Sequence, residues 1–111
     1  MAKIECTLQG NIDEILRDFD NAVMQSSSAT LEESSDFRTD NARCIVRAYE
    51  RYSYFGKGRV SLNIVLFQSD ERIKLSAVTT GGSQAVFFKM NTIGENSFLD
   101  TIRDVVGKYI M

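Results

Sequence analysis

The apolar and polar positions of this chain alternate with a period of two over most of its length and with a helical period in two stretches. In residues 3–8, Ile4, Cys6 and Leu8 alternate with polar residues, which predicts a strand with one buried face. Asn11 and Glu14 then have the spacing of a capping box, so we expect a helix to begin there. Its apolar stripe, at intervals of three, four and seven, consists of Ile12, Ile15, Leu16, Phe19, Val23 and Met24.

The middle of the chain predicts further strands in succession. They cover residues 28–37, 42–54, 60–67, 73–78 and 85–88. The first of them is interrupted by acidic residues, as is typical of a sheet edge, and Gly81-Gly82 is typical of a short hairpin turn. Thr92 and Glu95 repeat the capping-box spacing, which predicts a second helix that continues towards the C-terminus. The apolar stripe of this helix consists of Phe98, Leu99, Ile102, Val105, Val106, Tyr109 and Ile110.

The order β-α-β(5)-α predicts an α+β fold, in which a curved antiparallel sheet of about six strands carries two helices packed on one face. A chain of 111 residues has the size of one domain, so we expect residues 1–111 to form a single α+β domain.

Alternation also assigns each side chain to a face of the sheet. In residues 42–54 it predicts the core face as Ala42, Cys44, Val46 and Ala48, and the outer face as Arg43, Ile45, Arg47, Tyr49 and Arg51. On the outer face we expect Asp36 opposite Arg43 and Glu32 opposite Arg47. The same register turns Glu33 inward, a conflict that a β-bulge in residues 28–37 would resolve.

Composition and charge exclude several kinds of chemistry. The chain has no histidine, which removes Ser-His-Asp and Cys-His catalysis and HExxH zinc sites. The net charge is −2, and although Arg43, Arg47 and Arg51 with Tyr49 resemble a nucleic-acid platform, a solvated face with cross-strand ion pairs is favoured. Cys6 and Cys44 are far apart, which indicates free thiols. We expect no metal, no cofactor, no membrane segment and a cytoplasmic location.

The predicted outer face carries more apolar area than a solvated face needs. We predict an interface there, formed by Ile45, Arg47, Tyr49, Val65, Phe67, Val78 and Phe87. A noncatalytic interaction module that homodimerises through this face is the favoured interpretation, because soluble oligomers are most often two-fold. Scattered surface hydrophobic residues are the alternative.

The predicted inner face has several small residues under the C-terminal helix. A second hypothesis is a helix-grip-like binder of a small apolar ligand, held between this helix and the sheet. The predicted lining is Ala42, Cys44, Ala48, Ala77, Ile102 and Tyr109. Small residues can equally let the helix pack closer to the sheet.

Three segments carry a resemblance to a known family. They are residues 5–8 (ECTL), residues 43–52 (RCIVRAYERY) and residues 80–88 (TGGSQAVFF), and the likeness continues through residues 91–95. The chain resembles a family of small uncharacterised bacterial proteins, a domain of unknown function, which implies no activity, ligand or catalytic residues. The element order is also similar to the helix-grip fold of the START and pathogenesis-related lipid-binding superfamily and to the TATA-binding-protein-like fold.

Overall fold

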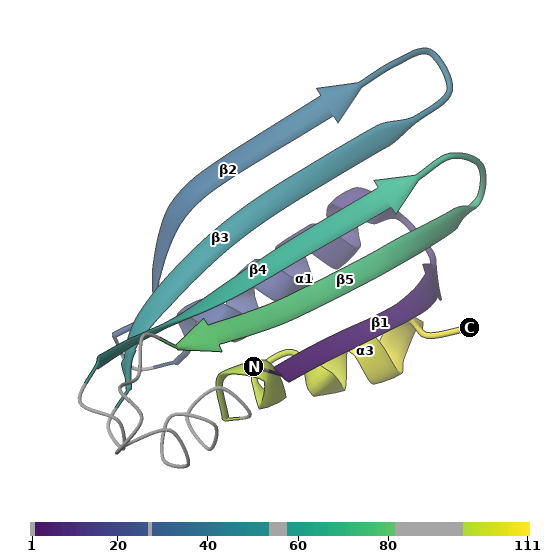
Figure 1. Cartoon of the computed structure of the whole chain (residues 1–111). Coiled ribbons are helices and arrows are strands. Elements are labelled where there is room, and N and C mark those ends of the chain that lie inside the picture. The colour runs from purple at the N-terminus through teal and green to yellow at the C-terminus, as the bar shows by residue number, and fades with distance from the viewer. Residues whose placement is uncertain (1, 27, 54–57, 82–96) are drawn as a thin grey trace.

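The computed structural model describes residues 2–26, 28–53, 58–81 and 97–111. Five strands form one antiparallel sheet in the order β1-β5-β4-β3-β2 (Figure 1). The strands are β1 (Ala2–Gln9), β2 (Thr30–Arg38), β3 (Arg43–Ser53), β4 (Gly58–Gln68) and β5 (Arg72–Gly81). The helices are α1 (Ile12–Met24) and α3 (Arg103–Tyr109), and residues 97–100 form a short helical turn.

The α+β class with an antiparallel sheet is confirmed, and the described residues contribute five strands to the sheet, where about six were predicted. The sixth predicted strand, residues 85–88, and the predicted helix start at Thr92 lie outside the described residues. Within the described ranges, no helix combines the length and the apolar character that a membrane span requires.

The local signals of α1 act as the sequence predicts. The side chain of Asn11 caps the helix by accepting a hydrogen bond from the backbone N–H of Glu14 at 3.0 Å. One stripe of the helix is buried, and it consists of Ile12, Ile15, Phe19 and Val23. Gly10 precedes the cap with φ +134°, a backbone conformation that favours glycine.

One face of the sheet contributes to the hydrophobic core. Figure 1 shows α1 behind the sheet, with α3 near the β1 edge. Buried residues of α1, of the C-terminal segment and of the strands belong to one apolar cluster. The inward residues of β4 and β5 are all buried: Val60, Leu62, Ile64, Leu66, Ile73, Leu75 and Ala77.

The predicted faces of β3 are wrong. Ile45 lies opposite Leu66 and Tyr49 lies opposite Leu62, so both side chains point to the core face, where they are buried. Cys44 lies opposite the exposed Phe67 and therefore points to the other face. We call the face with Ile45 and Tyr49 the inner face and the opposite one the outer face.

The predicted bulge in β2 is confirmed. The register of β2 on β3 shifts between Leu31 and Glu33. Glu33 stays in the same register as Phe37 and Cys44, and it lies opposite Ala48 on the outer face. Asp36 lies opposite Ile45 and not opposite Arg43 as predicted, but its carboxylate reaches Arg43 diagonally.

Candidate functional site

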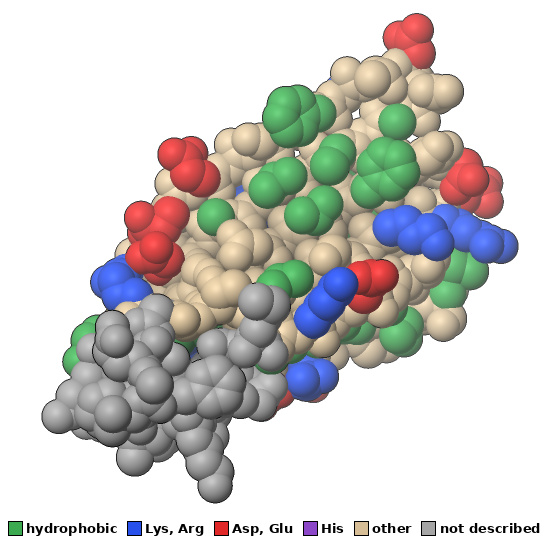
Figure 2. All heavy atoms as spheres, in the orientation of Figure 1, with side chains coloured by type: hydrophobic (Ala, Val, Ile, Leu, Met, Phe, Trp, Pro, Cys, Tyr) green, Lys and Arg blue, Asp and Glu red, His purple; other side chains and the backbone are tan. Residues whose placement is uncertain are grey.

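The outer face of the sheet carries an apolar surface that no described helix covers. Its seven apolar members come from four adjacent strands, and we call them the outer patch: Phe37, Cys44, Val46, Ala48, Val65, Phe67 and Val78. Phe37 and Phe67 are the most exposed of them, at 64% and 41%. Figure 2 shows hydrophobic side chains gathered over the middle of this face. An uncovered apolar surface of this kind is a candidate interaction surface.

The strand registers fix how the outer patch is arranged. One cross-strand row contains Phe37, Cys44, Phe67, Lys74 and Thr7, in this order from the β2 edge to the β1 edge. Its apolar members therefore lie on the β2 side, and its polar members lie on the β5 and β1 side. The patch is off-centre on the sheet as a result.

A second cross-strand row has a charged residue at each of its two ends. From β1 to β2 it contains Lys3, Val78, Asn63, Ala48 and Glu33. Both ends are charged with opposite signs, and the three residues between them are uncharged. Figure 2 shows acidic side chains along the β2 border and both basic and acidic ones towards β5 and β1.

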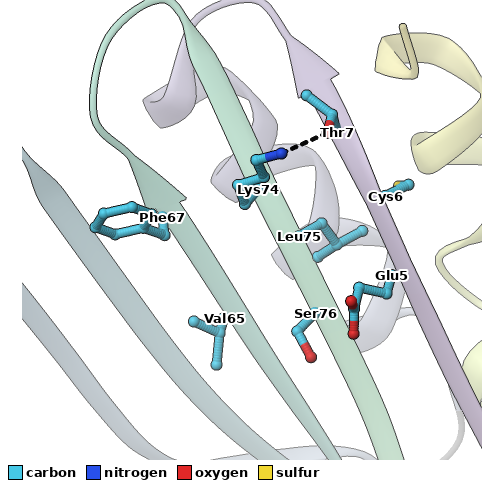
Figure 3. A pocket seen from close by; sticks show the side chains of 8 residues that line it. All are labelled: Glu5, Cys6, Thr7, Val65, Phe67, Lys74, Leu75 and Ser76. Carbon is cyan, nitrogen blue, oxygen red and sulfur yellow. Dashed lines mark hydrogen bonds between the residues drawn. The ribbon is translucent and has the colours of Figure 1, made fainter.

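An open depression of about 390 Å³ adjoins the outer patch on the side of β5 and β1. Val65 and Phe67 line one side of it, and Lys74 and Thr7 line the other (Figure 3). The Nζ atom of Lys74 donates a hydrogen bond to Oγ1 of Thr7 at 3.4 Å. The remaining lining residues are Glu5, Cys6, Leu75 and Ser76. The depression is thus apolar on the β4 side, and its β5 and β1 side is polar, with one cation, Lys74, and one anion, Glu5.

The predicted interface residues divide between the two faces. Val65, Phe67 and Val78 lie on the outer face, as predicted. Ile45 and Tyr49 are buried on the inner face, and their placement in an interface was wrong. Arg47 shares that inner face, since it lies opposite the buried Ile64, and the predicted contact residue Phe87 lies outside the described residues.

Ion pairing with α1 explains why the inner face of β3 holds arginines. Arg43 Nη1 lies 3.0 Å from Oδ1 of Asp13, and Arg47 Nη1 lies 3.1 Å from Oδ1 of Asp20. Both carboxylates belong to α1, so the aliphatic stems of the arginines cover the core while their charged ends are paired at its rim. The predicted Glu32 partner of Arg47 is thereby replaced by Asp20.

Tyr49 completes this network from inside the core. Its hydroxyl donates to Oδ1 of Asp20 at 2.8 Å, so one carboxylate oxygen receives both Tyr49 and Arg47. Burial, followed by the hydrogen bond to Asp20, raises the pKa of Tyr49 well above its ordinary value. The tyrosine is therefore a neutral donor that holds α1 on β3 at neutral pH.

Arg51, the third arginine of β3, also lies on the inner face. Its guanidinium lies 4.6 Å from the ring centroid of Phe98 and donates from Nη2 to Oγ of Ser97 at 3.0 Å. Burial lowers the pKa of Arg51. Arg43, Arg47 and Arg51 thus contact the helical side of the molecule, and they do not form an exposed nucleic-acid platform.

The residues predicted to line a ligand pocket do not come together. Cys44 and Ala48 lie on the outer face, whereas Ala77 and Ile102 are fully buried in the core on the inner side. The hydroxyl of Tyr109 hydrogen-bonds to Asp18 of α1, so this side chain is directed to the helix pair. Ala42, the remaining member, precedes β3 in the turn. The prediction of one pocket under the C-terminal helix was therefore wrong in its placement of Cys44 and Ala48.

Sequence reasoning missed four members of the outer patch as surface residues: Phe37, Cys44, Val46 and Ala48. The available signal was the spacing of Asp13 and Asp20, seven residues apart on one side of α1 and therefore suited to pair with two arginines of one strand face. Among the described residues, no group of three Cys, Asp or Glu side chains could hold a metal ion.

Comparison with known proteins places the chain in a family but transfers no activity. No curated protein matches it. A family model described as "Family of unknown function (DUF6054)" matches residues 1–110. The sequence resemblance to a family of unknown function is thereby confirmed, and the chain belongs to the DUF6054 family.

Proposed function

We propose that this protein is a noncatalytic interaction module that forms a homodimer through its outer patch. The observation that carries the proposal is the pair of exposed aromatic side chains, Phe37 and Phe67, on a sheet face that the described helices leave open. Burying an exposed Phe side chain contributes about 1.5–3 kcal/mol. Association through this face would therefore recover a substantial free energy.

The shape of the surface supports a second copy as the partner. A sheet face packs well on another sheet face at about 10 Å, with the strands of the two sheets nearly aligned. Most soluble oligomers are two-fold and use one patch on both copies. One uncovered sheet face that both copies use meets this requirement without any other protein.

The size of the surface also supports a dimer. The strands hold 8 to 11 residues. At about 3.3 Å per residue and about 4.8 Å between strands, the face measures about 20 by 30 Å, or about 600 Å² in flat projection. Side-chain relief adds to this area, which is of the same order as the about 800 Å² that each partner of a stable complex buries.

Light scattering coupled to size exclusion tests the proposal. The wild type should have twice the 12.5 kDa mass of one chain, and Phe67→Asp should shift it to the mass of a monomer, because a carboxylate would be buried against an apolar surface. Met24→Asp is the matched control, since Met24 is 46% exposed at the end of α1 and lies outside the patch. Circular dichroism verifies that each variant is folded.

Two results would contradict the proposal. One is a wild type that remains monomeric at several hundred micromolar, well above the dissociation constants of stable dimers. The other is a folded Phe67→Asp variant that keeps the dimer mass.

The two cysteines support a proposed cytoplasmic location. Cys6 and Cys44 are both free thiols, and free thiols persist in reducing compartments. Cell fractionation should recover the protein with cytoplasmic markers, and recovery from the medium or the membrane fraction would contradict this.

A further inference from the structure

We propose that the two copies stack with their two-fold axis along the strands, so that the basic β5 and β1 border of each copy lies over β3 and the acidic β2 border of the other. This inference rests on the proposed homodimer and specifies its geometry. Lys3 of each copy then comes within reach of Glu33 of the other copy.

Charge at the two borders is the first observation. The outward residues of β1 and β5 include three cations, Lys3, Arg72 and Lys74, and one anion, Glu5. On β2 the outward residues among those described are Thr30, Glu33, Ser35 and Phe37, which include an anion and no cation. The two borders of the same face therefore carry opposite net charge.

Symmetry converts this charge difference into a geometry. When two sheets pack face to face with aligned strands, the two-fold axis lies in the interface and runs either along the strands or across them. An axis along the strands exchanges the borders, so that β1 opposes β2 and β5 opposes β3 of the other copy. An axis across the strands places β2 on β2, and Glu33 then has no cation on the strand that it faces. Unpaired like charges oppose association, so the axis along the strands is favoured.

The relief of the surface supports the same choice. Phe37, the most exposed residue of the outer patch, lies at the β2 end of the row that has Lys74 and Thr7 at its other end. Exchange of the borders brings Phe37 of one copy over Thr7 of the other, on the β1 side of the depression. With the axis across the strands, Phe37 would lie on β2 of the other copy, far from that depression.

A charge-reversal cycle in the dimer dissociation constant tests the geometry. The variants are Lys3→Glu, Glu33→Lys and the double variant, measured in the full chain by sedimentation equilibrium at low salt. Each single reversal removes two symmetry-related pairs and creates two repulsions, so we expect the dissociation constant to rise about 3- to 10-fold. The double variant should return to within about 2-fold of the wild type, and about 1 M salt should reduce all these differences.

The large distance between Lys3 and Glu33 within one copy makes the mutant cycle specific for contacts between copies. Lys3 and Glu33 lie at opposite edges of the sheet, four strand spacings or about 19 Å apart within one copy. Residues so distant in one chain do not couple, so coupling in the dissociation constant reports a contact between copies. Lys3 also pairs with Glu5 in its own chain at 2.7 Å. The loss of this pair is common to the single and the double variant and cancels in the cycle.

The outcomes separate this inference from the proposed function. Recovery in the double variant supports the axis along the strands. A dimer that Phe67→Asp disrupts, but in which the double variant is as weak as the two single effects combined, overturns the geometry and leaves the homodimer intact. A wild type that is monomeric overturns both.

Discussion

The two faces of β3 differ in a way that hydropathy alone does not predict. The inner face carries three arginines with Ile45 and Tyr49, and it packs under α1. The outer face carries small apolar residues, Cys44, Val46 and Ala48, and no described helix covers it. The face with more charge is thus the one that faces the core, and the face with more uniform apolar character is the one that is open.

This difference shows what decides which face of an edge-proximal strand is buried. Long arginine side chains can cover a core with their methylene groups when carboxylates at its rim pair with their charged ends. Here α1 supplies those carboxylates through Asp13 and Asp20. On the outer face β3 has small side chains, and the described helices leave this face uncovered.

Truncation of one residue on each face gives the largest expected effect. Ile45 is 2% exposed and Val46, its neighbour, is half-buried on the outer face. We expect Ile45→Ala to lower the free energy of unfolding by about 2–5 kcal/mol, because it leaves a cavity in the core. Val46→Ala should cost less than about 1 kcal/mol.

Urea denaturation measures both variants in the Phe67→Asp background, so that association does not contribute to the difference. If Val46→Ala lowered the free energy of unfolding as much as Ile45→Ala or more, the assignment of the two faces would be contradicted.

Much of the fold could be predicted from the sequence because its signals are local. The capping of α1 by Asn11, the alternation of β4 and β5 and the bulge near Glu33 depend on residues that are close in the chain or in adjacent strands. The inward face of β3 could not be derived in this way. It depends on ion pairs between Arg47 and Asp20, which are 27 residues apart.

The outer patch could also be predicted only in part. Val65, Phe67 and Val78 were placed correctly, because β4 and β5 have one clearly apolar face and the remaining residues must point outward. Cys44 and Ala48 were misplaced by the same error that misplaced Ile45. The wrong face of one strand moved three of the seven patch members to the core, as the period of two requires.

Removal of one hydroxyl from each face gives an intermediate effect. Tyr49 is buried and donates to Asp20, whereas Tyr52 is 51% exposed near the end of β3. Tyr49→Phe should lower the free energy of unfolding by about 1–2 kcal/mol, because a hydrogen bond to a charged acceptor is lost. Tyr52→Phe should change it by less than about 0.5 kcal/mol. Guanidinium denaturation checks both, and a neutral Tyr49→Phe would show that the network does not hold α1 on β3.

The smallest expected effect concerns the acid stability that the inner face provides at its β2 end. Arg43 donates from Nε and Nη2 to the two carboxylate oxygens of Asp36 at 3.1 and 2.8 Å, and this lowers the pKa of Asp36 from 3.8 to about 2. The folded state therefore binds this proton less tightly than the unfolded state does. The resulting stabilisation is present above about pH 4 and is lost as the pH falls towards 2.

Asp36→Asn should accordingly be less stable than the wild type at pH 5, and the difference between the two should shrink as the pH falls to 2. Urea midpoints at pH 5, 3.5 and 2.5 measure this convergence. Asp40→Asn is the matched control, because Asp40 lies in the adjoining turn and forms no ion pair among the described residues. If the wild type and Asp36→Asn lost stability in parallel over this range, the pairing of Asp36 with Arg43 would not be a source of the stability of the inner face, and the contrast between the two faces of β3 would depend on Asp13 and Asp20 alone.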